Sequence, residues 1–579
     1  MYEERPWLRF YGDTPHRLEY PEVTLFGAFK AQVAVTPEAA ALSCLGRAVS
    51  FAELERLVVQ ISRGFAAEGM RRGDRVLVCL PNIPQAVIAF YALNRLGAVP
   101  TMIHPLSASA EIHALAVESS CTWAVVLDAF YPRFAKVLHE TSIARTVVCR
   151  VADALSPLAA AAFALTKGRR IARVPEGAGI VVWKRLQKRA GEDPELDDPD
   201  PLAVDDLAVI LFSGGTTGAP KAVMLSSRNC NAMALQVREA DTGRLGPGDS
   251  MLSILPMFHG FGLAVGIHAV LIHGGTCILI PRFTPDTLAK LVRKHRPQYM
   301  AGVPTLFDAL AADPVFRATR LSCFKGVFSG ADRLSRETKE GFEAVLVRNG
   351  GTVPLREGYG LTECVAATTL MPREHYRHGS VGVPCPDMYV KVVRVGTTDE
   401  AEPMEDGEIC VSGPTVMIGY LGHTTETAEV LRRHDDGRVW LHTGDLGAMD
   451  EDGFLFFRLR MKRIIKTSGV AVYPTTIEEV LHAHPAVRLA CVVGVPHPTK
   501  IQVPKGFVTL NEGWRGCVEL EQQLLEHCRA NLSPYSRPRF IEVRDKLPVT
   551  AVGKVDYRCL EREELDEATT PSPVDAVVD

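Results

Sequence analysis

The chain lacks several features that would mark special classes of protein. Its 14 cysteines include no Cys-x-x-Cys pair, which argues against a zinc ribbon and a dithiol redox motif. Its 64 basic and 68 acidic residues give a net charge of −4, so nothing indicates nucleic-acid binding. Residues 1–10 contain no apolar segment of the kind found in secretory signals. These absences predict a cytoplasmic protein with reduced thiols.

An uninterrupted membrane-spanning run is also missing. Residues 251–281 contain no Asp, Glu, Lys or Arg, and that length would suffice for a span. Glycines and the histidines His259, His268 and His273 interrupt the stretch. We therefore expect a loop, a buried helix over about 263–272 and a buried strand over 276–280.

The chain does contain alternating strand and helix patterns. Strand patterns at 75–80 and 98–104 flank a helix pattern at 84–96, with short turns between them. This arrangement predicts a parallel βαβ unit and an α/β fold. The 579 residues suggest several domains, or one large domain and one small one.

The stretch 211–227 carries the most informative pattern. A predicted buried strand, 207–212, leads into a glycine- and hydroxyl-rich loop that ends near Lys221 and contains Ser213, Gly214, Gly215, Thr216, Thr217 and Gly218. Backbone N–H groups, hydroxyls and a lysine ammonium suit a polyphosphate. The loop differs from the Gly-x4-Gly-Lys-Ser/Thr form because Lys221 follows Pro220. A glycine-rich surface turn with a chance lysine is the plain alternative.

Four further motifs follow along the chain. They are Gly326-Val-Phe-Ser-Gly-Ala-Asp332, Glu357-Gly-Tyr-Gly-Leu-Thr-Glu363, Trp440-Leu-His-Thr-Gly-Asp-Leu-Gly447 and Gly553-Lys554. Small residues after a strand let a flat base lie against the backbone. A carboxylate such as Glu363 suits magnesium, and one such as Asp445 can accept hydrogen bonds from two ribose hydroxyls.

In this order, from about residue 20 to about residue 560, the motifs resemble those of the adenylate-forming superfamily. That superfamily contains acyl-CoA synthetases, adenylation domains of peptide synthetases and luciferases. The resemblance implies a large N-terminal α/β domain (1–459), a small mobile C-terminal α+β domain (460–562) and a disordered tail (563–579). It also assigns the segment 408–420 to packing, not to chemistry.

The resemblance also implies roles for single residues. ATP is expected to contact the 213–218 loop, Lys221, Gly330, Ala331, Asp332, Gly358, Tyr359, Gly360, Thr362, Asp445, Arg460 and Lys554. Thr217 and Glu363 are expected to hold Mg²⁺, and Lys554, Thr362 and His259 to act in catalysis. The acyl pocket is expected at His259, Val303 and Cys364, the hinge at Lys462, and CoA at Ser468, Gly469 and Val470. Leu459 stands where relatives have Asp or Gly, which weakens the match at Arg460.

The function implied is ATP-dependent activation of a carboxylic acid as acyl-AMP, followed by transfer to CoA. The N-terminus and the segment 155–173 look like those of bacterial long-chain fatty-acid CoA ligases, which favours a fatty acid. Loading of a carrier protein, an aryl or short-chain acid, a luciferase-like oxidase and a non-catalytic binding relative remain alternatives. The segment 155–173 is apolar and then basic, so it fits either contact with the inner membrane face or a solvated hairpin. The oligomeric state, including a homodimer, stays open.

Overall fold

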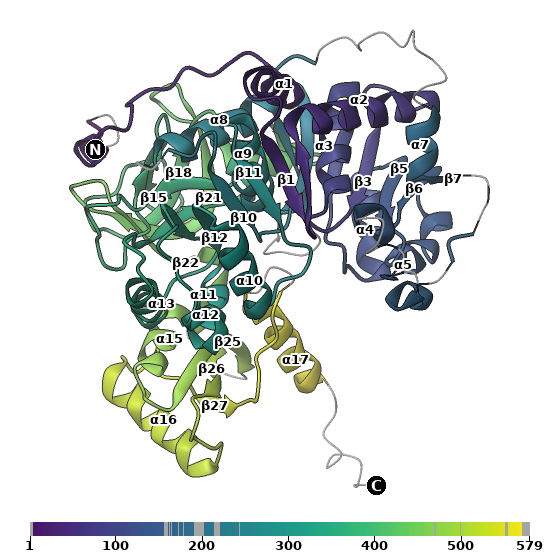
Figure 1. The fold of residues 1–579 in the computed structure, drawn as a ribbon. Helices are drawn as coiled ribbons and strands as arrows, with labels where there is room; N and C mark the ends of the chain where they lie inside the picture. Colours follow the sequence, from purple (N-terminus) through teal and green to yellow (C-terminus); the bar gives the residue numbers. More distant parts are fainter. Residues whose placement is uncertain are drawn as a thin grey trace, which may run out of the picture. The chain divides into compact units, whose positions relative to one another are not determined.

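The structure is a computed structural model. It describes the whole chain except residues 1–3, 156–159, 161, 164, 172, 176, 178, 190–201, 214–219, 242–243, 468–469, 498–499, 551–553 and 570–579. The chain forms two compact units (Figure 1). The first comprises residues 1–404, 410–443 and 449–456, and the second comprises 405–409, 444–448 and the chain from 457 onward. The last division in sequence therefore falls between Phe456 and Phe457, close to the predicted boundary after residue 459.

The first unit contains a mostly parallel sheet that has nine strands among the described residues. Their spatial order is β16 (Val383–Pro384), β15 (Ala367–Leu370), β14 (Leu355–Gly360), β13 (Gly326–Ser329), β12 (Tyr299–Gly302), β10 (Ser250–Ser253), β11 (Thr276–Leu279), β1 (Ala40–Cys44) and β2 (Arg47–Ser50). The helices α10 (Pro285–His295), α11 (Pro304–Ala312), α12 (Pro314–Arg317) and α13 (Arg336–Arg348) connect its central strands. A core built around Phe307, Phe316 and Phe342 joins these helices to the strands.

A second sheet of the same unit has eight described strands. Their order is β19 (Gly419–Tyr420), β9 (Lys221–Ser226), β8 (Leu207–Ser213), β4 (Val99–Met102), β3 (Arg75–Cys79), β5 (Trp123–Leu127), β6 (Arg145–Cys149) and β7 (Ile180–Val182). The helices around it are α2 (Phe51–Ala67), α4 (Ser109–Glu118), α5 (Tyr131–Ala135) and α7 (Trp183–Arg189). Figure 1 shows α2 and α7 on the opposite side of β3, β5 and β6 from α4 and α5. This doubly covered parallel sheet explains why its strands are apolar along their whole length.

Local signals set the ends of the predicted helices. Helix α3 (Pro84–Leu96) begins at a proline and ends at Gly97, whose φ of 75° lies in the left-handed region. Helix α2 begins where the Ser50 side chain accepts a hydrogen bond from the Glu53 backbone N–H. The predicted βαβ unit of residues 75–104 is confirmed, because β3 and β4 pair in parallel across α3.

Helices attached to both sheets contact one another. Helix α1 (Leu25–Val35) contacts α3, α8 (Ser227–Glu239) and α9 (Ala269–Ile272). The segment before α9, Phe261–His268, is a π-helix, whereas the sequence predicted one ordinary helix over 263–272. The strand predicted over 276–280 is present as β11. Among the described residues, no helix is long and apolar enough to cross a membrane.

A third sheet comes from the chain between residues 389 and 460. The order of its described strands is β17 (Tyr389–Val393), β18 (Gly407–Ser412), β21 (Val439–Met449) and β20 (Leu431–Arg433), and β22 (Leu455–Arg460) also pairs with β21. The boundary between the two units runs through β18, β21 and β22. Helix α14 (Thr424–Val430) lies between β19 and β20 in sequence.

The second unit has its own sheet and core. The strand order is β24 (Val470–Val472), β23 (Ile465–Thr467), β26 (Ile501–Leu510) and β25 (Val487–His497), and β27 (Phe540–Val543) also pairs with β26. Helices α15 (Pro474–His482) and α16 (Val518–Asn531) pack on this sheet through Ile477, Leu481 and Leu524. Helix α17 (Tyr557–Thr569) continues into the segment expected to be a disordered tail. The two units and their mixed strands and helices confirm the predicted α/β class.

Candidate active site

Several predicted site residues of the first unit lie in or directly after neighbouring parallel strands. Strands β12, β13 and β14 run in parallel, and their carboxyl ends lead to Val303, Gly330 and Thr362. In open α/β sheets, ligands bind outside the carboxyl ends of such strands. Ser329, at the end of β13, has a buried hydroxyl without a hydrogen-bond partner in the described part of the chain. This edge therefore offers a polar atom to a ligand.

The two ends of the predicted phosphate loop lie side by side. Strands β8 and β9 are antiparallel, and Ser213 is the cross-strand partner of Lys221. The loop is therefore the connection of a hairpin, with Lys221 at the first position of its second strand. The intervening Gly214, Gly215, Thr216, Thr217 and Gly218 lie outside the described residues.

In the structure, Lys221 and Glu363 both contact the side chain of Tyr420. The Tyr420 hydroxyl donates a hydrogen bond of 2.9 Å to Oε1 of Glu363. The Lys221 ammonium lies 4.8 Å from the centre of the Tyr420 ring. Tyr420 thus contacts both the predicted phosphate-binding lysine and the predicted metal-binding glutamate, although the sequence analysis assigned residues 408–420 to packing alone.

Three glycines allow the close packing of this region. A Cβ on Gly260 would collide with the carbonyl oxygen of Val365, and one on Gly360 would collide with that of Ala366. A Cβ on Gly330 would lie 3.2 Å from the Phe261 ring. The segment that leads to His259, the predicted ATP-contact residues 330–332 (the adenine wall) and the loop after Glu363 thus meet at positions where a side chain has little or no room.

The backbone after Glu363 is strained. Val365 has φ 66° and ψ −61°, and the Ala366 N–H donates to the Cys364 carbonyl at 2.7 Å. These values define a γ-turn of the rare, strained form, here on a β-branched residue. Ala331, in the predicted adenine wall, also has a positive φ of 70°. Strained positions of this kind concentrate at functional sites, where the surrounding structure maintains them.

Asn82 fixes the loop that leads to His259, and the sequence analysis did not single it out. Its side-chain amide donates to the carbonyl oxygens of Ser253 and Leu255, both at 2.9 Å. Its side-chain oxygen accepts from the backbone N–H of Met257 at 3.0 Å. Asn82 itself is 3% exposed. A polar residue in an otherwise apolar strand-to-helix turn was the signal that could have identified it.

A second buried network fixes the end of the π-helix. The Tyr91 hydroxyl lies 2.9 Å from Nδ1 of His268, and Nε2 of His268 lies 2.8 Å from Oδ1 of Asn231. Burial lowers the pKa of His268 to about 3, so the ring is neutral near pH 7. Nδ1 therefore accepts from Tyr91, and Nε2–H donates to Asn231. His268 thus links α3, α8 and the π-helix in the core.

Burial also sets the protonation of two side chains near the Glu363 motif. It raises the pKa of the Cys364 thiol well above its ordinary value, so this predicted pocket residue is a neutral thiol and not a nucleophile. It raises the pKa of Glu357, immediately before Gly358, to about 7. Glu357 therefore exchanges a proton in the physiological range.

Asp445 and Arg460, both predicted to contact ATP, form an ion pair. Nε of Arg460 lies 2.8 Å from Oδ1 of Asp445, and the Asp445 side chain is 1% exposed while that of Arg460 is 38% exposed. The structure therefore places these two side chains together despite the unusual Leu459. The Arg460 guanidinium thus places a positive charge beside this buried carboxylate.

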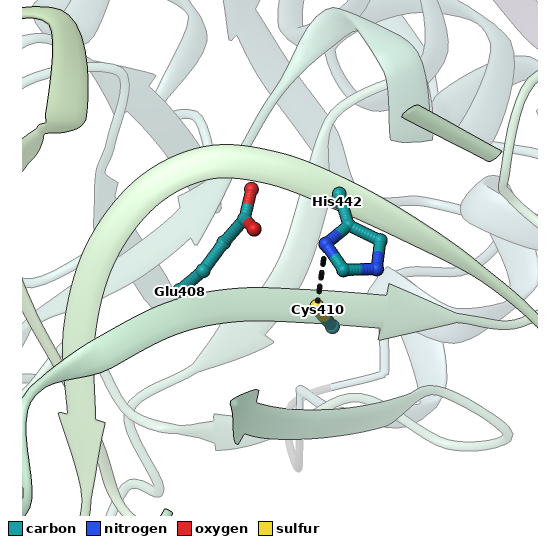
Figure 2. A group of neighbouring side chains, drawn as sticks. All are labelled: Glu408, Cys410 and His442. Atoms are coloured by element: carbon teal, nitrogen blue, oxygen red, sulfur yellow. Dashed lines mark hydrogen bonds between the residues drawn. The ribbon is translucent and has the colours of Figure 1, made fainter. Parts of the chain in front are cut away.

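His442, in the same motif, has both ring nitrogens engaged. Figure 2 shows the thiol of Cys410 at Nδ1 of His442, with Glu408 on the strand that carries Cys410. The sulfur–nitrogen distance is 3.6 Å, and Nε2 of His442 lies 2.9 Å from Nε2 of His434. Glu, Cys and His are metal-ligand types, but His442 already uses both nitrogens. We therefore assign this group to packing of the motif.

The predicted catalytic lysine, hinge and CoA residues belong to the second unit. The backbone N–H of Lys554 donates to the Thr550 hydroxyl at 3.2 Å. Lys462 is exposed in a short 3-10 helix, η7 (Met461–Arg463). Val470 begins β24, and the other two predicted CoA residues, Ser468 and Gly469, lie outside the described part of the chain.

Comparison with known proteins identifies the family. The model of the AMP-binding enzyme family matches residues 29–421, and that of the AMP-binding enzyme C-terminal domain matches 476–554. The chain belongs to the AMP-binding enzyme family. It is 33% identical over 580 aligned residues to a long-chain-fatty-acid–CoA ligase of Bacillus subtilis (strain 168), covering 98% of this chain and 99% of the relative. It is 32% identical over 531 residues to a feruloyl-CoA synthase of Amycolatopsis sp, covering 90% and 95%.

A solved structure agrees with this assignment. ATP-bound MatB from Rhodopseudomonas palustris superposes with a TM-score of 0.80 at 25% identity, covering 94% of this chain and all of that one. The predicted class, an AMP-forming acyl-CoA synthetase, is thereby confirmed, as is the expectation that ATP and CoA are its substrates.

Proposed function

We propose that the enzyme activates a fatty acid with ATP as acyl-AMP, releases pyrophosphate and transfers the acyl group to CoA. The observation that carries the proposal is the contact of both Lys221 and Glu363 with Tyr420. It joins a cation suited to phosphate and a carboxylate suited to a metal ion at the carboxyl edge of parallel strands.

In the first half-reaction, a carboxylate oxygen of the acid attacks the α-phosphorus of ATP, and the bond to pyrophosphate breaks. The carboxylate and the phosphate are both anionic, so the enzyme must neutralise charge and align the groups. We assign the α-phosphate and the acid to Lys554. Lys221 and the 213–218 loop would bind the leaving pyrophosphate, while Tyr359, Gly330 and Asp445 would hold the nucleoside.

Glu363 fits a magnesium site. Its carboxylate is half-buried, and in the described part of the chain Oε2 has no hydrogen-bond partner. Mg²⁺ prefers oxygen ligands and binds through one or two carboxylates together with phosphate oxygens. Glu363 would hold the ion together with Thr217. When bound, the ion would supply charge neutralisation at the phosphates.

In the second half-reaction, the CoA thiolate attacks the acyl carbon and AMP leaves. We assign the backbone change between the two half-reactions to Lys462, and CoA contacts to Ser468, Gly469 and Val470. A hinge of a few residues at the end of an element can absorb a large backbone change. The exposed position of Lys462 in η7 is compatible with such a change.

The acid is inferred from the pocket and from the relatives. Of the predicted pocket residues, Val303 and Cys364 are apolar or neutral, and neither supplies a cation that would bind the polar end of an amino acid. The similarity to a long-chain-fatty-acid–CoA ligase supports an aliphatic acid, and that to a feruloyl-CoA synthase supports an aryl acid as the second candidate.

A panel of acids tests the proposal. The enzyme is incubated with ATP, Mg²⁺ and each acid, from acetate to palmitate and including ferulate, and pyrophosphate and acyl-CoA are measured separately. We expect both products with long aliphatic acids. Turnover of ferulate alone would establish an aryl substrate, and pyrophosphate without acyl-CoA would point to a carrier protein. No pyrophosphate with any acid would contradict catalysis.

We also propose that residues 155–173 and their surroundings contact an anionic membrane surface. In the described part of the segment, Leu165 is 65% exposed, and Arg169, Arg170 and Arg173 are exposed close to it in sequence. An apolar side chain beside basic ones suits a lipid surface. Deletion of 155–173 should lower co-sedimentation with vesicles of phosphatidylglycerol and turnover of palmitate, but spare short soluble acids. Unchanged co-sedimentation would exclude this contact.

A further inference from the structure

The sheet pairing fixes Tyr420 relative to Lys221. Strand β19 is antiparallel to β9, with Tyr420 opposite Val223, and the Leu421 N–H donates to the Ala222 carbonyl at 2.9 Å. Lys221 lies two residues before Val223 on β9, so it shares a sheet face with Tyr420 as a diagonal neighbour. A long cationic side chain at that position can reach the aromatic ring, as the distance of 4.8 Å shows.

The same segment holds Glu363 at two points. The Met417 N–H donates to the Glu363 carbonyl at 2.8 Å, and the Tyr420 hydroxyl donates to its carboxylate at 2.9 Å. One contact fixes the backbone and the other fixes the carboxylate. Rotation of the Glu363 side chain would break the second contact, so the orientation of its oxygens depends on Tyr420.

The tyrosine also lies between two opposite charges. Among the described residues no ion pair joins Lys221 and Glu363, although the lysine lies over the Tyr420 ring and the glutamate accepts from the Tyr420 hydroxyl. A direct pair would occupy the ammonium and the carboxylate with each other, leaving both less able to bind phosphate and metal. The hydroxyl occupies one carboxylate oxygen with a neutral donor, and the ring face attracts the ammonium.

We propose that Tyr420 is a positioning residue that keeps Lys221 for the phosphates and Glu363 for the magnesium ion. The proposal rests on the function proposed above. It predicts that Tyr420 affects how strongly Mg²⁺ tightens nucleotide binding, and not only the stability of the fold.

The test measures binding, without turnover. The ligand is α,β-methylene ATP, which cannot release pyrophosphate, and its Kd is measured by calorimetry with and without Mg²⁺. In the wild type, Mg²⁺ should tighten binding by a factor that defines the coupling. Tyr420→Phe keeps the ring and removes the hydroxyl, so it should lower this factor by about 3- to 10-fold and leave the metal-free Kd unchanged. Tyr420→Leu also removes the ring, so it should weaken metal-free binding too, because Lys221 can then pair with Glu363.

Tyr376→Phe is the matched control. Tyr376 also has a lysine ammonium, that of Lys339, 4.6 Å from its ring centre, but it is 48% exposed and lies outside the site. This variant should behave as the wild type. The inference about Tyr420 is wrong if Tyr420→Phe retains the full coupling, or if it lowers the melting temperature and both affinities together. Absence of Mg²⁺-dependent tightening in the wild type would instead contradict the proposed function.

Discussion

Replacing Asn82 with alanine should separate binding of the acid from binding of ATP. Asn82 makes three buried hydrogen bonds to the loop that leads to His259, and it is 3% exposed. Alanine removes all three and leaves two carbonyl oxygens and one N–H without their partner. At about 1 kcal/mol net for each bond, the three together contribute about 3 kcal/mol to the free energy of unfolding.

The loss should appear in one substrate constant. The loop carries His259, which we place at the acyl pocket, while the predicted adenine wall follows a different strand, β13. We therefore expect the KM for palmitate to rise about 10-fold, because about half of those 3 kcal/mol would be lost from binding of the acid when the loop is no longer fixed. The KM for ATP should change less than about twofold. Steady-state kinetics with each substrate varied in turn, together with thermal denaturation, measures both effects.

Asn94→Ala controls for general destabilisation. Asn94 lies at the other end of α3, is 2% exposed, and accepts a hydrogen bond from the Phe26 N–H at 2.9 Å. It should lower the melting temperature without changing the ratio of the two KM values. Equal changes of that ratio in both variants would refute the role of Asn82 in holding the loop. Asn82→Asp should be at least as harmful as alanine, because a carboxylate would face two carbonyl oxygens.

Three further variants test other parts of the enzyme. Lys554→Ala should slow adenylation on the order of 10²-fold or more, yet largely spare thioester formation from supplied acyl-adenylate; equal losses would contradict its assigned role. Lys462→Pro fixes φ and removes the N–H, so first-turnover pyrophosphate release should persist while acyl-CoA formation falls; a parallel fall with lowered melting temperature would place the hinge elsewhere. His423 contacts Glu118 at 2.8 Å, and this hydrogen bond raises the pKa of His423. Because the folded-state pKa of His423 is raised, the pair with Glu118 contributes fully to the free energy of unfolding below about pH 6.5, and this contribution is lost as pH rises through the raised pKa. The melting-temperature difference between wild type and His423→Gln should therefore narrow as pH rises above about 6.5. A difference that stays constant with pH would exclude titration of His423 as its cause.

Sequence periodicity predicted the helices and strands whose ends are marked by residues such as proline and glycine. Helix α3 has the predicted bounds because Pro84 begins it and Gly97 ends it. The π-helix at Phe261–His268 was predicted as an ordinary helix, since apolar residues without charge show no period that distinguishes the two forms. Its contacts, such as the one between His268 and Asn231, come from helices distant in sequence.

The charged residues of the candidate site could also be predicted, because lysine and glutamate in glycine-rich motifs are unusual enough to be noticed. The structure places Asp445 against Arg460, two residues that the resemblance assigns to ATP. The strained Val365 turn could not be predicted, because valine favours extended backbone and only the surrounding packing imposes the left-handed conformation.

Neutral residues that hold these charged groups have no such signal. Tyr420 lies 57 positions from Glu363 and 199 from Lys221 in sequence, and only the pairing of β19 with β9 brings it to both. An aromatic residue before a glycine-containing turn is ordinary, so its pattern predicts packing. A site that binds a polyphosphate with its metal must keep a cation and a carboxylate close together yet unpaired. A neutral side chain that contacts both meets this requirement, so in such sites the residue between the charges is the one to seek in the structure.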